Sequence, residues 1–137
     1  FGPSAIAGIV KATDLAGYRN GHVYIRRSRH TPPTMEAVRD LMPALFELLQ
    51  QEDQAPVRIV FGHFFFVYIH PYMDGNGRMG RFLMNLMAAS GGYPWIIVPL
   101  ARRKGYMSAL EVASVDGDIK PFARFLAELA GGGIKTR

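Results

Sequence analysis

A short stretch in the middle of the chain, residues 70–81, holds four side chains that could take part in one reaction. His70 stands before a proline, Asp74 is the one carboxylate, and Arg78 and Arg81 follow three residues apart. An imidazole can act as a base near neutral pH, a carboxylate can bind a hard cation, and guanidinium groups bind phosphate oxygens. General-base attack on a phosphoryl group requires this set of groups.

Gly75 and Gly77 allow the same stretch to turn sharply and to expose backbone N–H groups, because glycine has no Cβ. We expect a helix to begin near Arg78, so that its free N–H groups and its dipole point at the loop. His70 is expected at the negative end of the preceding helix, with a pKa near neutral. The stretch therefore predicts an anion-binding loop with a base at its edge.

Simpler interpretations of this stretch exist. Asp74-Gly75 and Asn76-Gly77 are also ordinary turn dipeptides, and a lone histidine after a helix is more often structural than catalytic. An EF-hand is excluded because no glutamate closes the loop, and a Walker phosphate loop because Gly-Lys-Ser/Thr is absent. The close spacing of all four groups favours the catalytic interpretation. His63, two helical turns before the loop, is interpreted as structural.

The elements that must position this loop are mainly helical. Apolar residues recur at helical spacing, and a proline that follows His70 must end the helix before the loop. That helix is apolar nearly all round, so we expect it at the centre of the fold. A fragmentary helix is expected within Phe1–Gly17, and an extended piece over Trp95–Leu100. The predicted helices cover about 34–49, 56–70, 78–89, 106–113 and 121–130.

A short β-hairpin is predicted ahead of the first long helix. Asn20-Gly21 is a turn signal, and Val23, Tyr24 and Ile25 form a run that favours β structure. The fold class is therefore all-α with one short β flap.

Composition sets the outer limits. With 137 residues, 49% of them hydrophobic and 20% charged, we expect one folded domain over 1–137. There is no cysteine, which excludes disulfides and thiolate metal sites, and no apolar run is long enough to cross a membrane. We expect a cytoplasmic protein, with an effector delivered into another cell as the alternative.

The formal charge of +5 is compatible with nucleic acid, an acidic lipid surface or a polyphosphate as ligand. A basic, non-catalytic binding module is the alternative from another class, but the aromatic residues lie at core spacing rather than along a basic stripe, so we expect no nucleic acid and no membrane as partner. A cluster at Arg26, Arg27 and Arg29 is interpreted as a solvated turn, or else as a contact to an acidic surface of a target. A second cluster, Arg102-Arg103-Lys104, receives no role.

The loop resembles the signature of the Fic family. His70-Pro71-Tyr72-Met73-Asp74-Gly75-Asn76-Gly77-Arg78-Met79-Gly80-Arg81 matches His-x-Phe-x-Asp/Glu-Gly-Asn-Gly-Arg-x-x-Arg, with Tyr72 where phenylalanine is usual. The resemblance covers about 16–129 and implies the Fic fold in an N-terminally trimmed segment. It implies a protein adenylyltransferase that transfers AMP from Mg-ATP to a Ser, Thr or Tyr hydroxyl of a target protein and releases pyrophosphate.

The resemblance also implies a role for individual residues. His70 would be the catalytic base, Asp74 would bind Mg²⁺, and Val23, Tyr24 and Ile25 would dock the target by strand addition. The nucleotide-binding set would be Gly75, Asn76, Gly77, Arg78, Arg81 and Tyr106.

Two positions depart from relatives and bear on the donor. Ser114 stands where an asparagine is common, and Met107 where some relatives carry an aromatic residue. Tyr106 has a plain core role as its alternative. A Fic-fold transferase that uses another nucleotide or phosphate-linked donor therefore stays open.

The resemblance raises the question of regulation. Fic enzymes are commonly restrained by Ser/Thr-x-x-x-Glu-Gly/Asn, whose glutamate pairs with the second arginine of the loop, here Arg81. That pattern is absent from this sequence. We expect constitutive activity, unless an inhibitory helix comes from elsewhere in the protein or from an antitoxin partner in trans.

Overall fold

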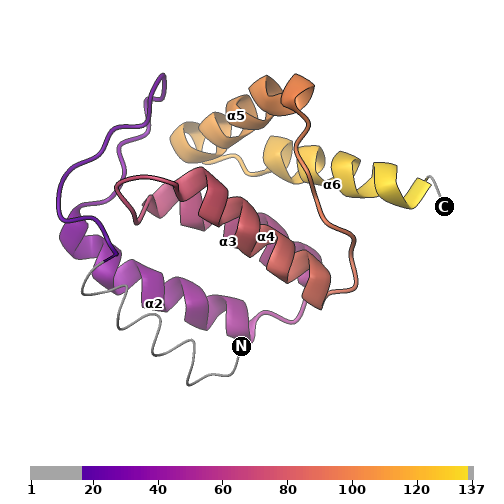
Figure 1. Cartoon of the computed structure of the whole chain (residues 1–137), viewed down its shortest axis with the longest axis horizontal. Helices are drawn as coiled ribbons and strands as arrows, with labels where there is room; N and C mark the ends of the chain where they lie inside the picture. Colours follow the sequence, from indigo (N-terminus) through magenta and orange to yellow (C-terminus); the bar gives the residue numbers. More distant parts are fainter. Residues whose placement is uncertain (1–16, 136–137) are drawn as a thin grey trace.

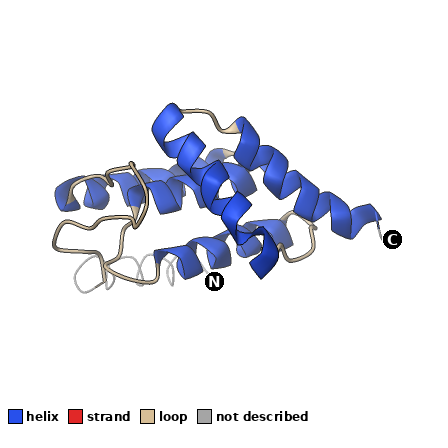
Figure 2. Cartoon of the chain, turned by 90° about the horizontal axis from the view of Figure 1, so that it is seen from above, coloured by secondary structure: helices blue, strands red, loops and turns tan. Residues whose placement is uncertain are grey.

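A computed structural model describes residues 17–135, and Figure 1 shows their arrangement. The described residues contain no strand, as Figure 2 shows, so the all-α prediction is confirmed. A short 3₁₀ turn, η1, precedes α5, and a π-helical turn, η2, follows it. The elements are α2 (Met35–Gln51), α3 (Ala55–Ile69), α4 (Asn76–Ser90), η1 (Leu100–Arg102), α5 (Arg103–Glu111), η2 (Val112–Asp116) and α6 (Lys120–Lys135).

Helix α3 lies at the centre of the packing, as its apolar surface predicts. One group of buried residues joins α3 to α2, and a second joins it to α4, α5 and α6. Close packing against α4 depends on Gly80, where a Cβ would come within 3.0 Å of the Val67 side chain and 3.2 Å of the His63 ring. The loop between α3 and α4 is therefore held at both ends by tightly packed helices.

Local signals set the limits of these helices. The Thr34 hydroxyl accepts a hydrogen bond from the N–H of Ala37 at 3.2 Å and caps α2. Helix α3 ends at His70, which adopts a left-handed conformation immediately before Pro71. Gly75, with φ +80, precedes α4, so this helix begins at Asn76, two residues before the predicted start.

The predicted β-hairpin is not seen. Val23, Tyr24 and Ile25 lie in an irregular loop, 18–33, whose one backbone turn is closed by the Ser28 N–H donating to Ile25 O at 3.1 Å. An isolated pair of strands is marginally stable in water. This loop is instead fixed by bonds to other elements, including one from the Arg19 N–H to Pro71 O at 2.8 Å.

The segment after α4, predicted as extended, also has no partner strand within the part of the chain that the structure describes. It runs back toward α5 (Figure 1), and the Asn85 side chain takes the place of a strand. Its amide donates to Ile96 O at 3.2 Å and its oxygen accepts from Ile96 N–H at 2.6 Å. Buried backbone groups in irregular segments need such side-chain partners.

The helix expected within Phe1–Gly17 lies almost wholly outside the described residues. Among the described helices, none combines the length and the apolar character needed to span a bilayer.

Candidate active site

The structure distributes the predicted site residues over two cavities. One, of about 670 Å³, is lined by His70, Asn76, Gly77, Arg81 and Tyr106 together with residues of the loop 18–33 and of α5. The other, of about 700 Å³, is lined by Asp74, Gly75 and Arg78, whereas the predicted docking residues Val23 and Tyr24 line neither cavity. We call the first the histidine cavity and the second the aspartate cavity.

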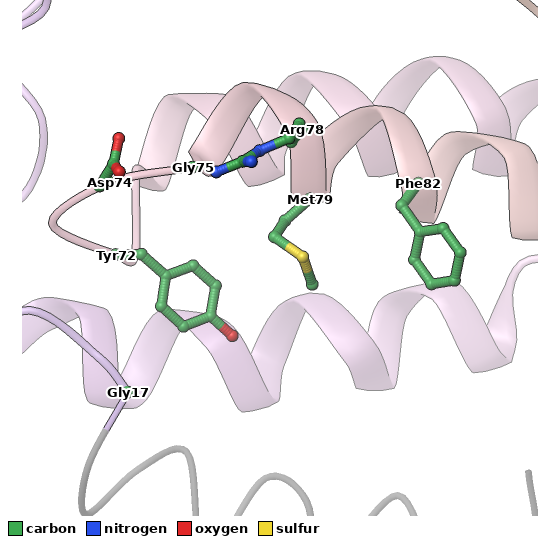
Figure 3. Close-up of a pocket in the computed structure, with 7 residues that line it drawn as sticks. All are labelled: Gly17, Tyr72, Asp74, Gly75, Arg78, Met79 and Phe82. Atoms are coloured by element: carbon green, nitrogen blue, oxygen red, sulfur yellow. The ribbon is translucent and has the colours of Figure 1, made fainter.

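Figure 3 shows the aspartate cavity. Asp74 and Gly75 occupy the turn before α4, and Arg78 extends from the first turn of that helix. Met79 and Phe82 also line this cavity, although their side chains are apolar and half exposed. The polar side chains of this lining are those of Asp74, Arg78 and Tyr72.

His70 is held in position by the end of α3. Its backbone N–H donates to Phe66 O at 3.0 Å, and its φ of +54 turns the chain out of the helix. The Nδ1 atom is buried and has no hydrogen-bond partner among residues 17–135. Burial lowers the pKa of His70, the Val67 backbone raises it, and Arg19 and His30 lower it further. The prediction of a pKa near neutral is therefore corrected downward.

Arg19 explains part of that shift and was not predicted as a site residue. Its side chain is 2% exposed. It donates to His70 O at 2.6 Å, to Ile69 O at 3.2 Å, to Gly21 O at 3.1 Å and to Pro33 O. A cation thus caps the negative end of α3 and offsets the dipole that would have raised the pKa of His70.

Asn76 closes the loop with its side chain. The oxygen accepts from the Tyr72 N–H at 2.8 Å, and the amide donates to Tyr72 O at 2.8 Å. Both polar atoms of a residue that is 3% exposed are therefore engaged within the loop. The first backbone N–H groups of α4 have no partner inside the helix. These groups, rather than the Asn76 side chain, are the free donors of the loop.

Each of the two loop glycines lies under an arginine. A Cβ at Gly75 would meet the Arg78 guanidinium at 3.1 Å, and a Cβ at Gly77 would meet the Arg81 guanidinium at 3.1 Å. Both guanidinium groups are thus folded back over the loop. A side chain at either position would require the arginine above it to shift by a few tenths of an ångström, and the φ of +80 at Gly75 also favours glycine.

Asp74 is the one carboxylate of the loop, and it is exposed. The described residues contain no group of three or more His, Cys, Asp or Glu side chains that could hold a metal. Magnesium in nucleotide sites takes one or two carboxylates and fills its other positions with phosphate oxygens and water. A single exposed carboxylate beside an anion-binding loop fits that mode of binding.

Tyr106 lines the histidine cavity but is a core residue. It is 3% exposed, and its hydroxyl lies 2.6 Å from Nε2 of His63. Burial lowers the pKa of His63 to about 4, the Gly80 backbone raises it, and Arg81 lowers it. This environment is consistent with the structural interpretation of His63. The contact between the His63 ring and the Tyr106 hydroxyl gives Tyr106 a core role as well.

Glu111 is a second residue that the sequence interpretation missed. From the end of α5, its carboxylate accepts from the Ser28 hydroxyl and from the Arg29 N–H, the latter at 2.8 Å. These two bonds lower the pKa of Glu111. The contact joins residues more than 80 positions apart and fixes the loop 18–33 against α5 at the rim of the histidine cavity.

Comparison with known proteins agrees with the loop signature. A family model described as the Fic/DOC family matches residues 5–88, which is more than half of the chain. The chain belongs to the Fic/DOC family. The resemblance seen in the sequence is thereby confirmed.

Curated relatives of this Fic/DOC chain carry the name protein adenylyltransferase Fic. Those from Drosophila persimilis and Drosophila virilis are each 35% identical over 127 residues, covering 90% of this chain. The alignment covers 24% and 26% of their own lengths, so this chain spans about a quarter of these relatives.

Solved structures agree with the fold. A Fic-1 fragment from C. elegans has a TM-score of 0.78 at 30% identity, over 88% of this chain and 36% of the fragment. A Fic family protein from Desulfovibrio desulfuricans has a TM-score of 0.73 at 30% identity, over 88% of this chain and 41% of that protein. The helical core of this Fic/DOC chain is the one found in these structures.

Proposed function

We propose that this chain is the catalytic core of a protein adenylyltransferase, which moves AMP from Mg-ATP to a Ser, Thr or Tyr hydroxyl of a target protein. The observation that carries the proposal is the shared cavity of His70, Gly77 and Arg81 at the N-terminus of α4. A base and an anion-binding helix end there face the same space. The name protein adenylyltransferase, carried by the Drosophila relatives, supports the proposal.

The phosphates of the donor would bind at the start of α4. The free N–H groups of its first turn and the Arg81 guanidinium lie at one wall of the histidine cavity. Arg78 and Asp74 lie on the same loop, at the aspartate cavity, and both are exposed. To bind the β- and γ-phosphates and magnesium, these two side chains would have to reach across the edge of the loop toward the histidine cavity. Magnesium, when bound, would neutralise charge on the phosphates.

The transfer step follows from the position of His70. The target hydroxyl oxygen attacks the α-phosphorus, the bond from that phosphorus to the bridging oxygen of the β-phosphate breaks, and pyrophosphate leaves with the electron pair. The hydroxyl proton passes to the imidazole, which is neutral at pH 7 because burial lowers its pKa. Because Nδ1 is buried, Nε2 is the nitrogen that would accept the proton.

The partner is then a protein with an accessible hydroxyl side chain. The loop 18–33 would guide it, with Val23, Tyr24 and Ile25 as the docking segment. Tyr24 is 89% exposed, which suits contact with a partner. An inhibitory helix or an antitoxin in trans would act on Arg81.

The donor base is a separate question. Met107 and Ser114 both line the histidine cavity, and a thioether can pack on a purine. The preferred nucleotide would show as the adduct mass when the chain and a cell lysate are incubated with magnesium and ATP, GTP, CTP or UTP in turn. AMP adducts alone are expected.

The central test compares His70→Ala with the unmodified chain. Transfer of labelled AMP should fall by about 10²-fold or more, since a general base contributes at least that factor, whereas ATP binding should be retained. Arg39→Ala is the control, because Arg39 is exposed on α2 and lines neither cavity. Transfer that persists in His70→Ala would refute the assignment of the base.

A further inference from the structure

The histidine cavity gathers basic residues from three distant parts of the sequence. Arg26 and Arg27 come from the loop 18–33, Arg81 from α4, and Arg103 and Lys104 from the start of α5. The first and last groups receive no catalytic role in the proposed transfer. Their convergence is a property of the fold, since nothing in the sequence places residues 26 and 104 together.

Little in the lining offsets these charges. Glu111 is the one carboxylate among the residues that line this cavity, against five cations. Its oxygens already accept from the Ser28 hydroxyl and the Arg29 N–H. A nucleoside triphosphate, with charge partly neutralised by magnesium and with Arg81 at its phosphates, would leave much of the positive charge uncompensated.

The turn that carries Arg26 and Arg27 is held in place by contacts with other residues rather than merely solvated. Glu111 fixes it from α5, and the Ser28 N–H closes it onto Ile25 O at 3.1 Å. Arg27 has a φ of +60, a left-handed conformation that costs about 1 kcal/mol or more for a residue other than glycine and persists only where neighbours impose it. A segment restrained in this way presents its cations at the cavity in a defined position.

The start of α5 likewise presents cations at the histidine cavity. Arg102 is turned away, since it pairs with Glu128 at 2.8 Å and lies over the Phe125 ring. Arg103 and Lys104 are exposed, and the structure gives neither a carboxylate partner among the described residues. Ile25 and Met107 also line the cavity and add apolar side chains to it.

We infer that Arg26, Arg27, Arg103 and Lys104 form a second anion-binding wall, which takes acidic side chains of the target polypeptide beside the hydroxyl that is modified. The inference rests on the proposed function and specifies its target class. The mixture of cations with apolar side chains in the cavity lining suits a peptide segment better than the repeated phosphates of a nucleic acid, which are bound along a basic groove with stacked aromatic side chains.

Binding of synthetic peptides tests this wall without relying on catalysis. One fluorescein-labelled peptide carries a central tyrosine flanked by aspartates, and its partner carries asparagines at the same positions. Fluorescence anisotropy with the 137-residue chain, at low ionic strength and with a non-hydrolysable ATP analogue present, should show the acidic peptide binding about fivefold more tightly or better.

Two charge-matched double variants identify the surface. Arg26→Gln with Lys104→Gln removes two cations of the wall and should abolish the preference for the acidic peptide. Arg39→Gln with Arg124→Gln removes two exposed cations from α2 and α6, outside the cavity lining, and should retain it. Equal binding of both peptides, or equal loss in both variants, would overturn the inference.

Two further outcomes assign the cations elsewhere. If the ATP analogue displaces the acidic peptide, the wall belongs to the nucleotide phosphates and the inference fails. If a short single-stranded RNA binds more tightly than the acidic peptide, with a steep salt dependence, the ligand is a nucleic acid and the inference also fails. If the unmodified chain prefers the acidic peptide but transfers no AMP, the proposed function alone is refuted.

Discussion

Protonation of His63 should make this chain sensitive to mild acid. The side chain is 0% exposed, and burial lowers its pKa from an ordinary 6.5 to about 4. Between these two pH values the unfolded chain binds a proton that the folded chain does not bind. The free energy of unfolding therefore decreases as the pH falls from about 6.5 toward about 4, and the stabilisation is complete above that range.

The size of this effect follows from the shift. Each pKa unit corresponds to about 1.4 kcal/mol, so a difference between 6.5 and about 4 amounts to about 3 kcal/mol. A domain of this size is stable by about 5–15 kcal/mol, so the loss is a large fraction of the total. With a urea m value of about 2 kcal/mol per M, the midpoint should move by about 1.5 M.

Urea unfolding followed by far-ultraviolet circular dichroism, at several pH values from 7 to 4.5, measures this effect. His63→Gln removes the titrating group while keeping an amide that can reach the Tyr106 hydroxyl. Carboxylates titrate in both proteins, so the difference in pH slope isolates His63. His22→Gln, at an exposed position, should keep the original slope. An equal slope in His63→Gln and the unmodified chain would refute the reasoning.

One pH dependence and two substitutions at or beside the loop test the site further. The rate of AMP transfer should stay constant as the pH is lowered to below 6.5, because burial lowers the pKa of His70. A rate that begins to fall above pH 6.5 would contradict the assignment of His70 as the base. Arg19→Met should cost about 3 kcal/mol of unfolding free energy, since buried carbonyls lose a charged donor, and should raise the His70 pKa seen by NMR; a cost under about 1 kcal/mol argues against it. Asn76→Ala should cost about 2–4 kcal/mol in thermal or urea unfolding, because both backbone groups of Tyr72 lose partners, and unchanged stability would disprove this.

Much of the helical framework could be predicted because its signals are local. Thr34 caps α2, Pro71 ends α3, and the apolar surface of α3 indicates its central position. Helix α4 begins two residues earlier than expected because Gly75, in its left-handed conformation, directs the chain into the helix before Arg78. Three statements stay predictions: that 1–137 is one domain, that the resemblance to the family covers about 16–129, and that the protein is cytoplasmic.

The β flap could not be predicted correctly, because strand pairing depends on a partner. Val23 and Ile25 favour β structure by composition alone, but no neighbouring strand is present among the described residues. Arg19 and Glu111 supply the contacts that fix this loop, each across more than 50 positions of the chain. Contacts of that range leave no periodic signal in a sequence.

The sequence was enough to predict phosphoryl-transfer chemistry for the loop, because a histidine, a carboxylate, three glycines and two arginines occupy twelve consecutive positions. Capping and proline effects also act over a few residues, so the start of α2 and the end of α3 could be predicted, whereas α5 begins three residues earlier and α6 ends five residues later than expected. Tertiary contacts were needed to show that the Asn76 side chain closes the loop and that Asp74 lines a different cavity from His70. The same packing brought Arg26 and Lys104 to the lining of one cavity, because burial of apolar helix faces, rather than attraction between charges, sets which distant segments meet.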